Sequence, residues 1–95
     1  MVINFEQVHN YYERLVFEAV AGLSESYPAY SADNLADVAC VALNRLPARY
    51  VRHDVDMMFY LTEKERLNIE DSLSEALSFA IAFVGKRMPK QGVLA

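Results

Sequence analysis

Apolar residues recur at spacings of three and four along the first quarter of the chain, which predicts an amphipathic helix that begins after Asn4. Asn4 is a favourable N-cap residue, and Gln7 three positions later completes a capping-box pattern. The periodicity breaks over residues 24–31, where Pro28 biases the residue before it away from helical angles, so we expect a loop there. The stripe of this first helix consists of Phe5, Val8, Tyr12, Leu15, Val16, Ala19, Val20 and Leu23.

A second helix is expected to begin near residues 31–33 and to run to about Arg45. Pro47 has no amide hydrogen and clashes with the preceding turn, so this helix should end at or just before Leu46. Residues 48–61 are rich in β-branched and aromatic side chains and permit either an extended segment or a short helix. We expect an extended link followed by a short helix at Val55–Tyr60. The stripe of the second helix consists of Leu35, Val38, Ala39, Ala42 and Leu43.

The last predicted helix begins at a second capping box, which Thr62 forms with Glu65. We expect Gly85 to end it, with Lys86 and Arg87 placed at the negative end of the helix dipole. The sequence therefore predicts an all-α fold, a small bundle of three to four helices in a single domain over residues 1–95, with a flexible tail at 86–95. The stripe of this helix consists of Ile69, Leu73, Ala76, Leu77, Ala80, Ile81 and Val84.

The composition indicates that the protein associates with a partner. Hydrophobic residues make up 54% of the 95 positions, which is more apolar surface than one small core can bury, so we expect an intertwined or face-packed homodimer. The sequence has neither a secretory signal nor an apolar run long enough to cross a bilayer, and its single cysteine excludes an intrachain disulfide. We therefore expect a cytoplasmic protein with no membrane contact. The net charge of −4 argues against nucleic acid as a partner.

Enzymatic motifs are absent from the sequence. It has no glycine-rich phosphate loop, no histidine pair at helical spacing and no Cys-x-x-Cys, so we predict neither catalysis nor a metal site. His9 is interpreted as a helix residue and Cys40 as a small packing residue. Asp54 and Asp56 together with His53 offer metal ligands, but solvated loop acids explain the same residues.

Positive charge is concentrated at the proline segment. Residues 1–44 carry a net charge of −5, whereas residues 45–53 carry +3. Arginine binds phosphate through planar paired donors, and Tyr50 adds a stacking face, so the segment is a candidate anion site. The alternative is that these arginines pair with the chain's own acids, such as Asp37, Asp54 and Asp56. The candidate ligand-binding residues are Arg45, Arg49, Tyr50, Arg52, His53, Asp54 and Asp56.

The same segment resembles the central motif of the late-competence-development ComFB family. Residues 37–51 read DVACVALNRLPARYV, and the family pattern is an acid, an apolar pair, and then Ala-Leu-Asn-x-Leu-Pro-x-basic-Tyr-Val. The stretch NYYERLVFEAV, residues 10–20, also resembles the family's N-terminal helix. The two stretches together cover 26 of the 95 residues. The matching positions are Asp37, Val38, Ala42, Leu43, Asn44, Leu46, Pro47, Arg49, Tyr50 and Val51.

This resemblance implies a helical homodimer that acts as a non-enzymatic regulatory or signal-binding module. Some family members are associated with cyclic di-GMP. Such a ligand would place its phosphates on Arg45, Arg49 and Arg52, a base on Tyr50, and a guanine edge near Asp54 or Asp56. The alternative is a protein–protein interaction adaptor, linked to competence or surface behaviour, that presents residues 57–60 to an unidentified protein.

Zinc binding by cysteines, which the resemblance implies for other members, does not carry over to this chain. Those members have several cysteines just before the acid of the motif, whereas this chain has Ala29, Ser31 and Asn34 there. A thiolate zinc site therefore cannot form before the acid of the motif in this chain. We expect packing of Tyr27, Pro28 and Tyr30 to hold this loop instead.

Overall fold

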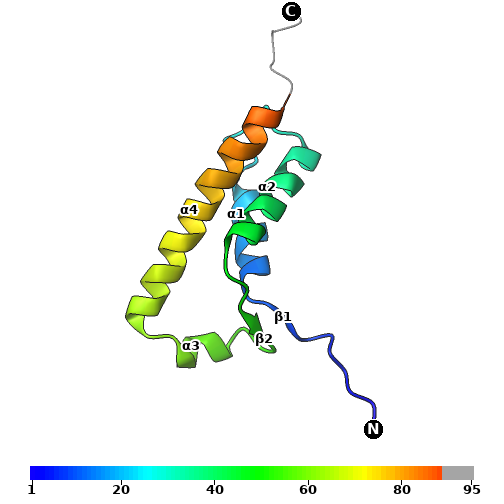
Figure 1. Ribbon diagram of the computed structural model, residues 1–95, viewed down its shortest axis with the longest axis vertical. Coiled ribbons are helices and arrows are strands. Elements are labelled where there is room, and N and C mark those ends of the chain that lie inside the picture. Colours follow the sequence, from blue (N-terminus) through cyan, green and yellow to red (C-terminus); the bar gives the residue numbers. More distant parts are fainter. Residues whose placement is uncertain (89–95) are drawn as a thin grey trace, which may run out of the picture.

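Four helices follow one another along residues 1–88, the part of the chain that the computed structural model describes (Figure 1). A two-stranded antiparallel ribbon joins the segments before the first helix and after the second. The small all-α bundle predicted from the sequence is confirmed. Most of the tail predicted to be flexible, from residue 89 on, lies outside the described residues. The elements are β1 (His9–Asn10), α1 (Tyr12–Leu23), α2 (Ala32–Arg45), β2 (Tyr50–Val51), α3 (Asp56–Tyr60) and α4 (Glu63–Arg87).

The core lies where α1 and α4 pack against α2. Each of the predicted stripes contributes buried side chains, so the apolar periodicity identified the inward faces correctly. Small residues such as Ala76 and Ala80 are fully buried on α4, which lets α2 approach it closely. The first half of α4 runs past the end of α2 toward α3, as Figure 1 shows. The buried core residues are Tyr12, Val16, Val20, Val38, Ala39, Ala42, Leu46, Ala76, Ala80 and Val84.

The first helix begins at Tyr12, so the prediction of a helix start after Asn4 is wrong. Asn10 provides the physical reason, because its side-chain oxygen accepts the amide hydrogens of Tyr12 at 3.2 Å and of Arg49 at 3.1 Å. The amide of Tyr11 also donates to the Arg49 carbonyl at 2.7 Å. These bonds hold residues 9–10 in a strand, with His9 opposite Val51 and Asn10 opposite Tyr50. The chain before this ribbon is left outside the bundle.

Residues 4–8 form a turn where the sequence predicted a first helical turn. The Asn4 side chain accepts the amide hydrogen of Glu6 at 2.8 Å, and the Val8 amide donates to the Phe5 carbonyl at 3.0 Å. Phe5 and Val8 are therefore exposed and do not take part in the buried stripe of α1.

The other helix starts follow local capping signals. The Asn34 amide donates to the Ser31 hydroxyl at 3.0 Å, and the Glu65 amide donates to the Thr62 hydroxyl at 3.1 Å. The predicted starts of α2 and α4 are thus confirmed. The extended link and the short helix before Thr62 are confirmed as well, with α3 over Asp56–Tyr60.

Gly85 does not end the last helix, which corrects a second prediction. Helix α4 continues to Arg87, and Met88 is its C-cap. Gly85 instead makes room for Tyr30, whose hydroxyl donates to the Ile81 carbonyl at 2.8 Å. The Tyr27 ring contacts Tyr30 edge-on, with 5.5 Å between centroids. Aromatic packing by these two tyrosines therefore fixes the loop before α2, as the sequence predicted.

Candidate ligand-binding segment

Arg45, the first arginine of the candidate site, is bound to the protein's own surface. It extends from the last turn of α2 to Glu75 of α4, with its Nη2 at 2.7 Å and its Nε at 2.9 Å from Oε1. Its guanidinium also lies 3.9 Å from the centroid of the Phe79 ring. The hydrogen bond from Arg45 lowers the pKa of Glu75. Arg45 thus links α2 to α4, and its partner is none of the three acids that the sequence suggested.

Arg49, Tyr50 and Arg52 remain largely open to solvent on the link that contains β2. Arg49 lies beside a cavity of about 190 Å³, where its Nη1 is 3.9 Å from a Glu65 carboxylate oxygen. The Tyr50 side chain is 68% exposed. Arg52 forms no ion pair within residues 1–88. These three residues are the part of the predicted site that is available to an anion.

Asp54 belongs to a three-residue charged cluster that ties the link to the start of the chain. Its Oδ1 lies 2.6 Å from His9 Nε2, and its Oδ2 accepts from Arg14 Nε at 3.2 Å. The other His9 nitrogen, Nδ1, lies 2.6 Å from the Gln7 carbonyl oxygen. Because both ring nitrogens face acceptors, the geometry fits the doubly protonated imidazolium.

The pKa values in this cluster shift accordingly. The Gln7 carbonyl and then Asp54 raise the pKa of His9, and the bonds from His9 and Arg14 lower the pKa of Asp54. Asp54 therefore has a structural role in this fold. The interpretation of His9 as a helix residue is wrong, since it lies in β1.

His53 and Asp56 complete the predicted set. The His53 carbonyl accepts the Asp56 amide hydrogen at 3.0 Å, which starts α3. Their side chains form no ion pair in the described part of the chain. The seven predicted residues are thus divided between structural contacts, made by Arg45 and Asp54, and an exposed group on the link.

Four residues that organise the segment were missed by the sequence analysis: His9, Asn10, Arg14 and Glu75. Each contacts a residue at least 30 positions away in the chain. No local spacing predicts such contacts. The only signal was the ComFB-like stretch at residues 10–20, which includes Asn10 and Arg14.

Next to this segment, helix α3 exposes an apolar surface. Met57 is buried, whereas Met58, Phe59 and Tyr60 are 67%, 80% and 74% exposed, and Val55 just before the helix is also exposed. We call these four exposed residues the α3 face. Arg66 holds α3 in place, because its Nη2 donates to the Met58 carbonyl at 3.0 Å.

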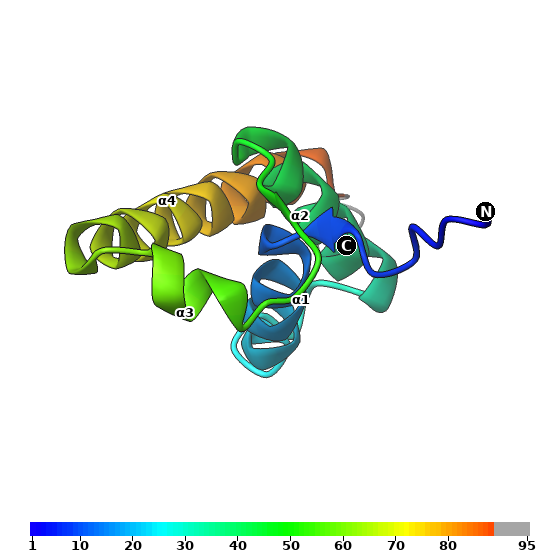
Figure 2. The same ribbon diagram turned by 90° about the horizontal axis from the view of Figure 1, so that it is seen from below.

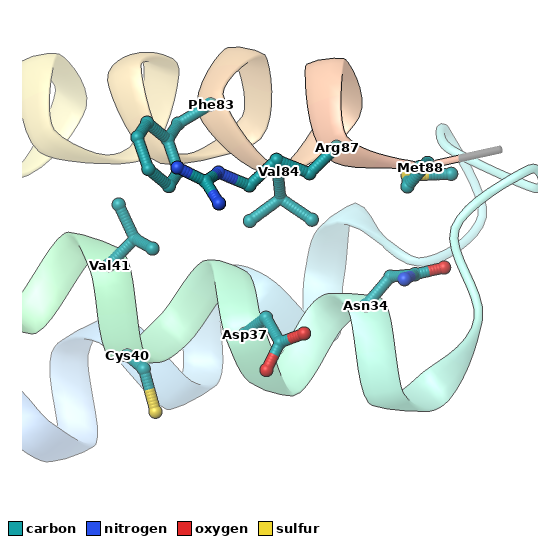
Figure 3. Close-up of a pocket in the computed structure, with 8 residues that line it drawn as sticks. All are labelled: Asn34, Asp37, Cys40, Val41, Phe83, Val84, Arg87 and Met88. Atoms are coloured by element: carbon teal, nitrogen blue, oxygen red, sulfur yellow. The ribbon is translucent and has the colours of Figure 1, made fainter. Parts of the chain in front are cut away.

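A groove of about 410 Å³ lies between α2 and the end of α4 on the surface of the bundle (Figure 3). Figure 3 shows Asp37 and Cys40 on α2 and the Arg87 side chain beside Phe83 on α4, where the guanidinium lies 4.5 Å from the ring centroid. Cys40 is exposed, so its interpretation as a packing residue is wrong. In residues 1–88, no three His, Cys, Asp or Glu side chains come together in a way that could hold a metal ion.

Comparisons with known proteins identify one family. The family model described as "Late competence development protein ComFB" matches residues 9–88. No curated protein and no solved structure matches the chain. Among the described helices, none is both long enough and apolar enough to span a membrane.

Proposed function

The chain belongs to the ComFB family of late competence development proteins, and we propose that it is a non-enzymatic regulator that acts by binding another protein through the α3 face. The family indicates a competence-related regulatory role. The binding mode is supported by one observation: a helix of only five residues buries Met57 and leaves its next three large side chains exposed. Exposed apolar groups that are held in place are typical of interaction sites.

The chemistry of this face suits a protein partner. Methionine adapts to irregular surfaces, and aromatic side chains contribute large contact areas at a small entropic cost. The face is also preorganised, because the Leu61 amide donates to the Met57 carbonyl at 3.1 Å and Arg66 bonds to Met58. A partner with a complementary apolar groove or helix would therefore bind without first ordering α3.

The test of this proposal compares two exposed phenylalanines. Phe59→Asp places a charge on the α3 face, and Phe17→Asp places the same charge on an exposed position of α1. Each variant replaces the host's own copy, and transformation frequency is measured at equal protein level. We expect Phe59→Asp to lower the frequency and Phe17→Asp to leave it near wild type. Equal frequencies in the two variants would contradict the proposal.

A second candidate function is recognition of cyclic di-GMP on the link. It is favoured by Tyr50, which is 68% exposed, and by Arg52, which has no ion pair within residues 1–88. Tyr50 would stack on a base while the arginines neutralise phosphates. Arg45 and Asp54 are left out of this proposed site, because Arg45 already binds Glu75 and Asp54 already binds His9 and Arg14. The residues that remain for it are Arg49, Tyr50, Arg52, His53 and Asp56.

Calorimetric titration with cyclic di-GMP tests this second function. We expect Arg52→Ala to weaken binding by about tenfold or more, because a charge-assisted hydrogen bond contributes about 1.5–3 kcal/mol. Arg45→Ala is the matched control, and it should bind like the wild type. If the wild-type protein gives no heat while a known receptor does, the cyclic di-GMP function is excluded and the protein-binding proposal is unaffected.

A further inference from the structure

A small cavity with a mostly polar lining lies between the start of α1, the link and the first half of α4. Its volume is about 190 Å³, below the range of about 300–1,000 Å³ that is typical of pockets for drug-sized ligands. Figure 2 views the bundle from the end where these three segments meet. The volume therefore suits a small metabolite rather than a dinucleotide. We call this space the polar cavity, and it is lined by Tyr12, Arg49, Glu65, Asn68, Ile69 and Ser72.

Asn10 places two of the lining residues. Its side-chain oxygen accepts the amide hydrogens of Tyr12 at 3.2 Å and of Arg49 at 3.1 Å. The Arg49 carbonyl also accepts the Tyr11 amide hydrogen at 2.7 Å. The backbone of Arg49 is thus bonded at both its amide and its carbonyl. These bonds bring a guanidinium group and a phenol to one cavity before any ligand binds.

The Tyr12 hydroxyl has no hydrogen-bond partner among residues 1–88, although the residue is only 5% exposed. Burial raises the pKa of Tyr12, so the hydroxyl keeps its proton at neutral pH and can donate a hydrogen bond. Within the described residues, every fully enclosed polar side-chain atom has a partner. The Tyr12 hydroxyl must therefore open into the polar cavity, which Tyr12 lines.

Glu65 offers one carboxylate oxygen to the same cavity from α4. Its Oε1 accepts from the Thr62 hydroxyl at 3.2 Å, as part of the capping box that starts α4. Its Oε2 lies 3.9 Å from Arg49 Nη1, which is longer than a hydrogen bond. The two opposite charges therefore face the cavity without a direct bond, and each can bind a ligand. Asn68 and Ser72, four residues apart on one face of α4, add an amide and a hydroxyl.

We propose that the polar cavity binds a free α-amino acid with a small polar side chain. The carboxylate of the ligand would accept the paired donors of Arg49, and its ammonium group would donate to Glu65 Oε2. The remaining polar groups of the cavity suit an amide or hydroxyl side chain, since Ile69 is the only aliphatic residue of the lining. A free amino acid carries both charges on one carbon centre, whereas a peptide separates them at its two ends.

This site goes beyond the proposed function, and it shares no residue with the α3 face. It shares Arg49 with the second candidate function, whereas Tyr50 and Arg52 do not line the cavity. Arg52→Ala should therefore leave amino-acid binding unchanged while it weakens any binding of cyclic di-GMP. Failure of the amino-acid site is thus distinguishable from failure of either function proposed above.

Calorimetric titration of the full-length protein with L-serine, L-asparagine and L-glutamine gives the first test. We expect at least one of them to bind. The same amino acid with its amino group acetylated, or with its carboxyl group amidated, lacks one of the two charges and should bind at least about tenfold more weakly. No binding by any of the three, or equal binding by the blocked forms, would overturn the proposal.

Two variants then locate the binding. Tyr12→Phe removes only the hydroxyl and should weaken binding by about threefold or more, whereas Glu65→Gln removes the charge and should weaken it by about tenfold or more. Glutamine also serves in a capping box, so α4 should keep its start, which circular dichroism checks. Glu70→Gln is the matched control, because Glu70 lies outside the polar cavity, and it should bind like the wild type. Wild-type affinity in Tyr12→Phe or in Glu65→Gln would place the ligand elsewhere and overturn the proposal.

Discussion

The hydroxyl of Tyr30 occupies the space that a side chain at position 85 would need. A Cβ built on Gly85 lies 2.5 Å from that oxygen, which donates to the Ile81 carbonyl at 2.8 Å. A tyrosine from the loop before α2 thus bonds to the backbone of α4 through a gap that a glycine leaves. This contact fixes the loop without any metal ligand.

Gly85→Ala should destabilise the protein even though alanine favours helices. The added methyl group would displace Tyr30 and break its hydrogen bond, which we expect to cost about 2 kcal/mol against about 1 kcal/mol gained from helix propensity. The net loss of about 1 kcal/mol in the free energy of unfolding is measured by urea denaturation. Gly22→Ala is the control, because nothing lies within 4 Å of its added Cβ, and it should stabilise α1 slightly.

The effect of Gly85→Ala on the free energy of unfolding should change sign when the Tyr30 hydroxyl is removed. In a Tyr30→Phe background the nearest atom to the new Cβ is the ring carbon at 3.6 Å, an ordinary contact. Gly85→Ala should then raise the free energy of unfolding. An alanine that destabilises both backgrounds equally would show that Tyr30 is not the cause.

Asn10 should be the most sensitive polar residue of the fold. Asn10→Ala leaves the amides of Tyr12 and Arg49 without an acceptor in a buried or half-buried place, which we expect to cost about 1–3 kcal/mol. Asn44→Ala removes an exposed bond to the Cys40 carbonyl and should stay within about 0.5 kcal/mol of the wild type. Thermal unfolding compares the two, and equal losses would contradict the role of Asn10.

The His9–Asp54 contact predicts a stability that depends on pH. Because the folded pKa of His9 is raised above its ordinary 6.5, the stabilisation is full below pH 6.5 and is lost as the pH rises through the folded value. The pKa of Asp54 is lowered from 3.8, so the contribution of Asp54 is lost as the pH falls through its lower folded value. The His9–Asp54 contact therefore stabilises the folded protein most between about pH 4 and 6.5.

Unfolding midpoints measured from pH 5 to 9 check this prediction. The difference in unfolding midpoint between the wild type and Asp54→Asn should be largest at the acidic end of that range and should shrink as the pH rises. Arg14→Ala keeps His9 and Asp54 and should retain most of the pH dependence. A difference that is constant or grows with pH would contradict the assigned protonation state.

Helices α2 and α4 were predictable because their signals are local. Ser31 and Thr62 mark the starts by hydrogen bonds that span three residues, and the apolar stripes repeat within each helix. Pro47 likewise ends α2 through its own backbone chemistry. Such information is contained in a few consecutive residues.

The start of the chain and the candidate site were not predictable in this way. Strand β1 has only two residues, too few for any periodicity, and Asn10 finds its partner 39 positions later. Arg45 pairs with Glu75 only because α2 packs beside α4, although acids closer in sequence seemed to be its partners. The charge count of the sequence located the positive segment. Which of its arginines form ion pairs with the protein's own acids depends on how the helices pack.

The central claim is that this protein binds another protein through the α3 face, and site-specific photo-cross-linking in cells tests it most directly. A photoreactive benzoyl-phenylalanine replaces Phe59 in one strain and Phe17 in another. We predict an adduct of one discrete mass from position 59, distinct from a cross-linked pair of this chain, and no such adduct from position 17. Adducts of the same pattern from both positions, or only self-adducts from position 59, would contradict the claim.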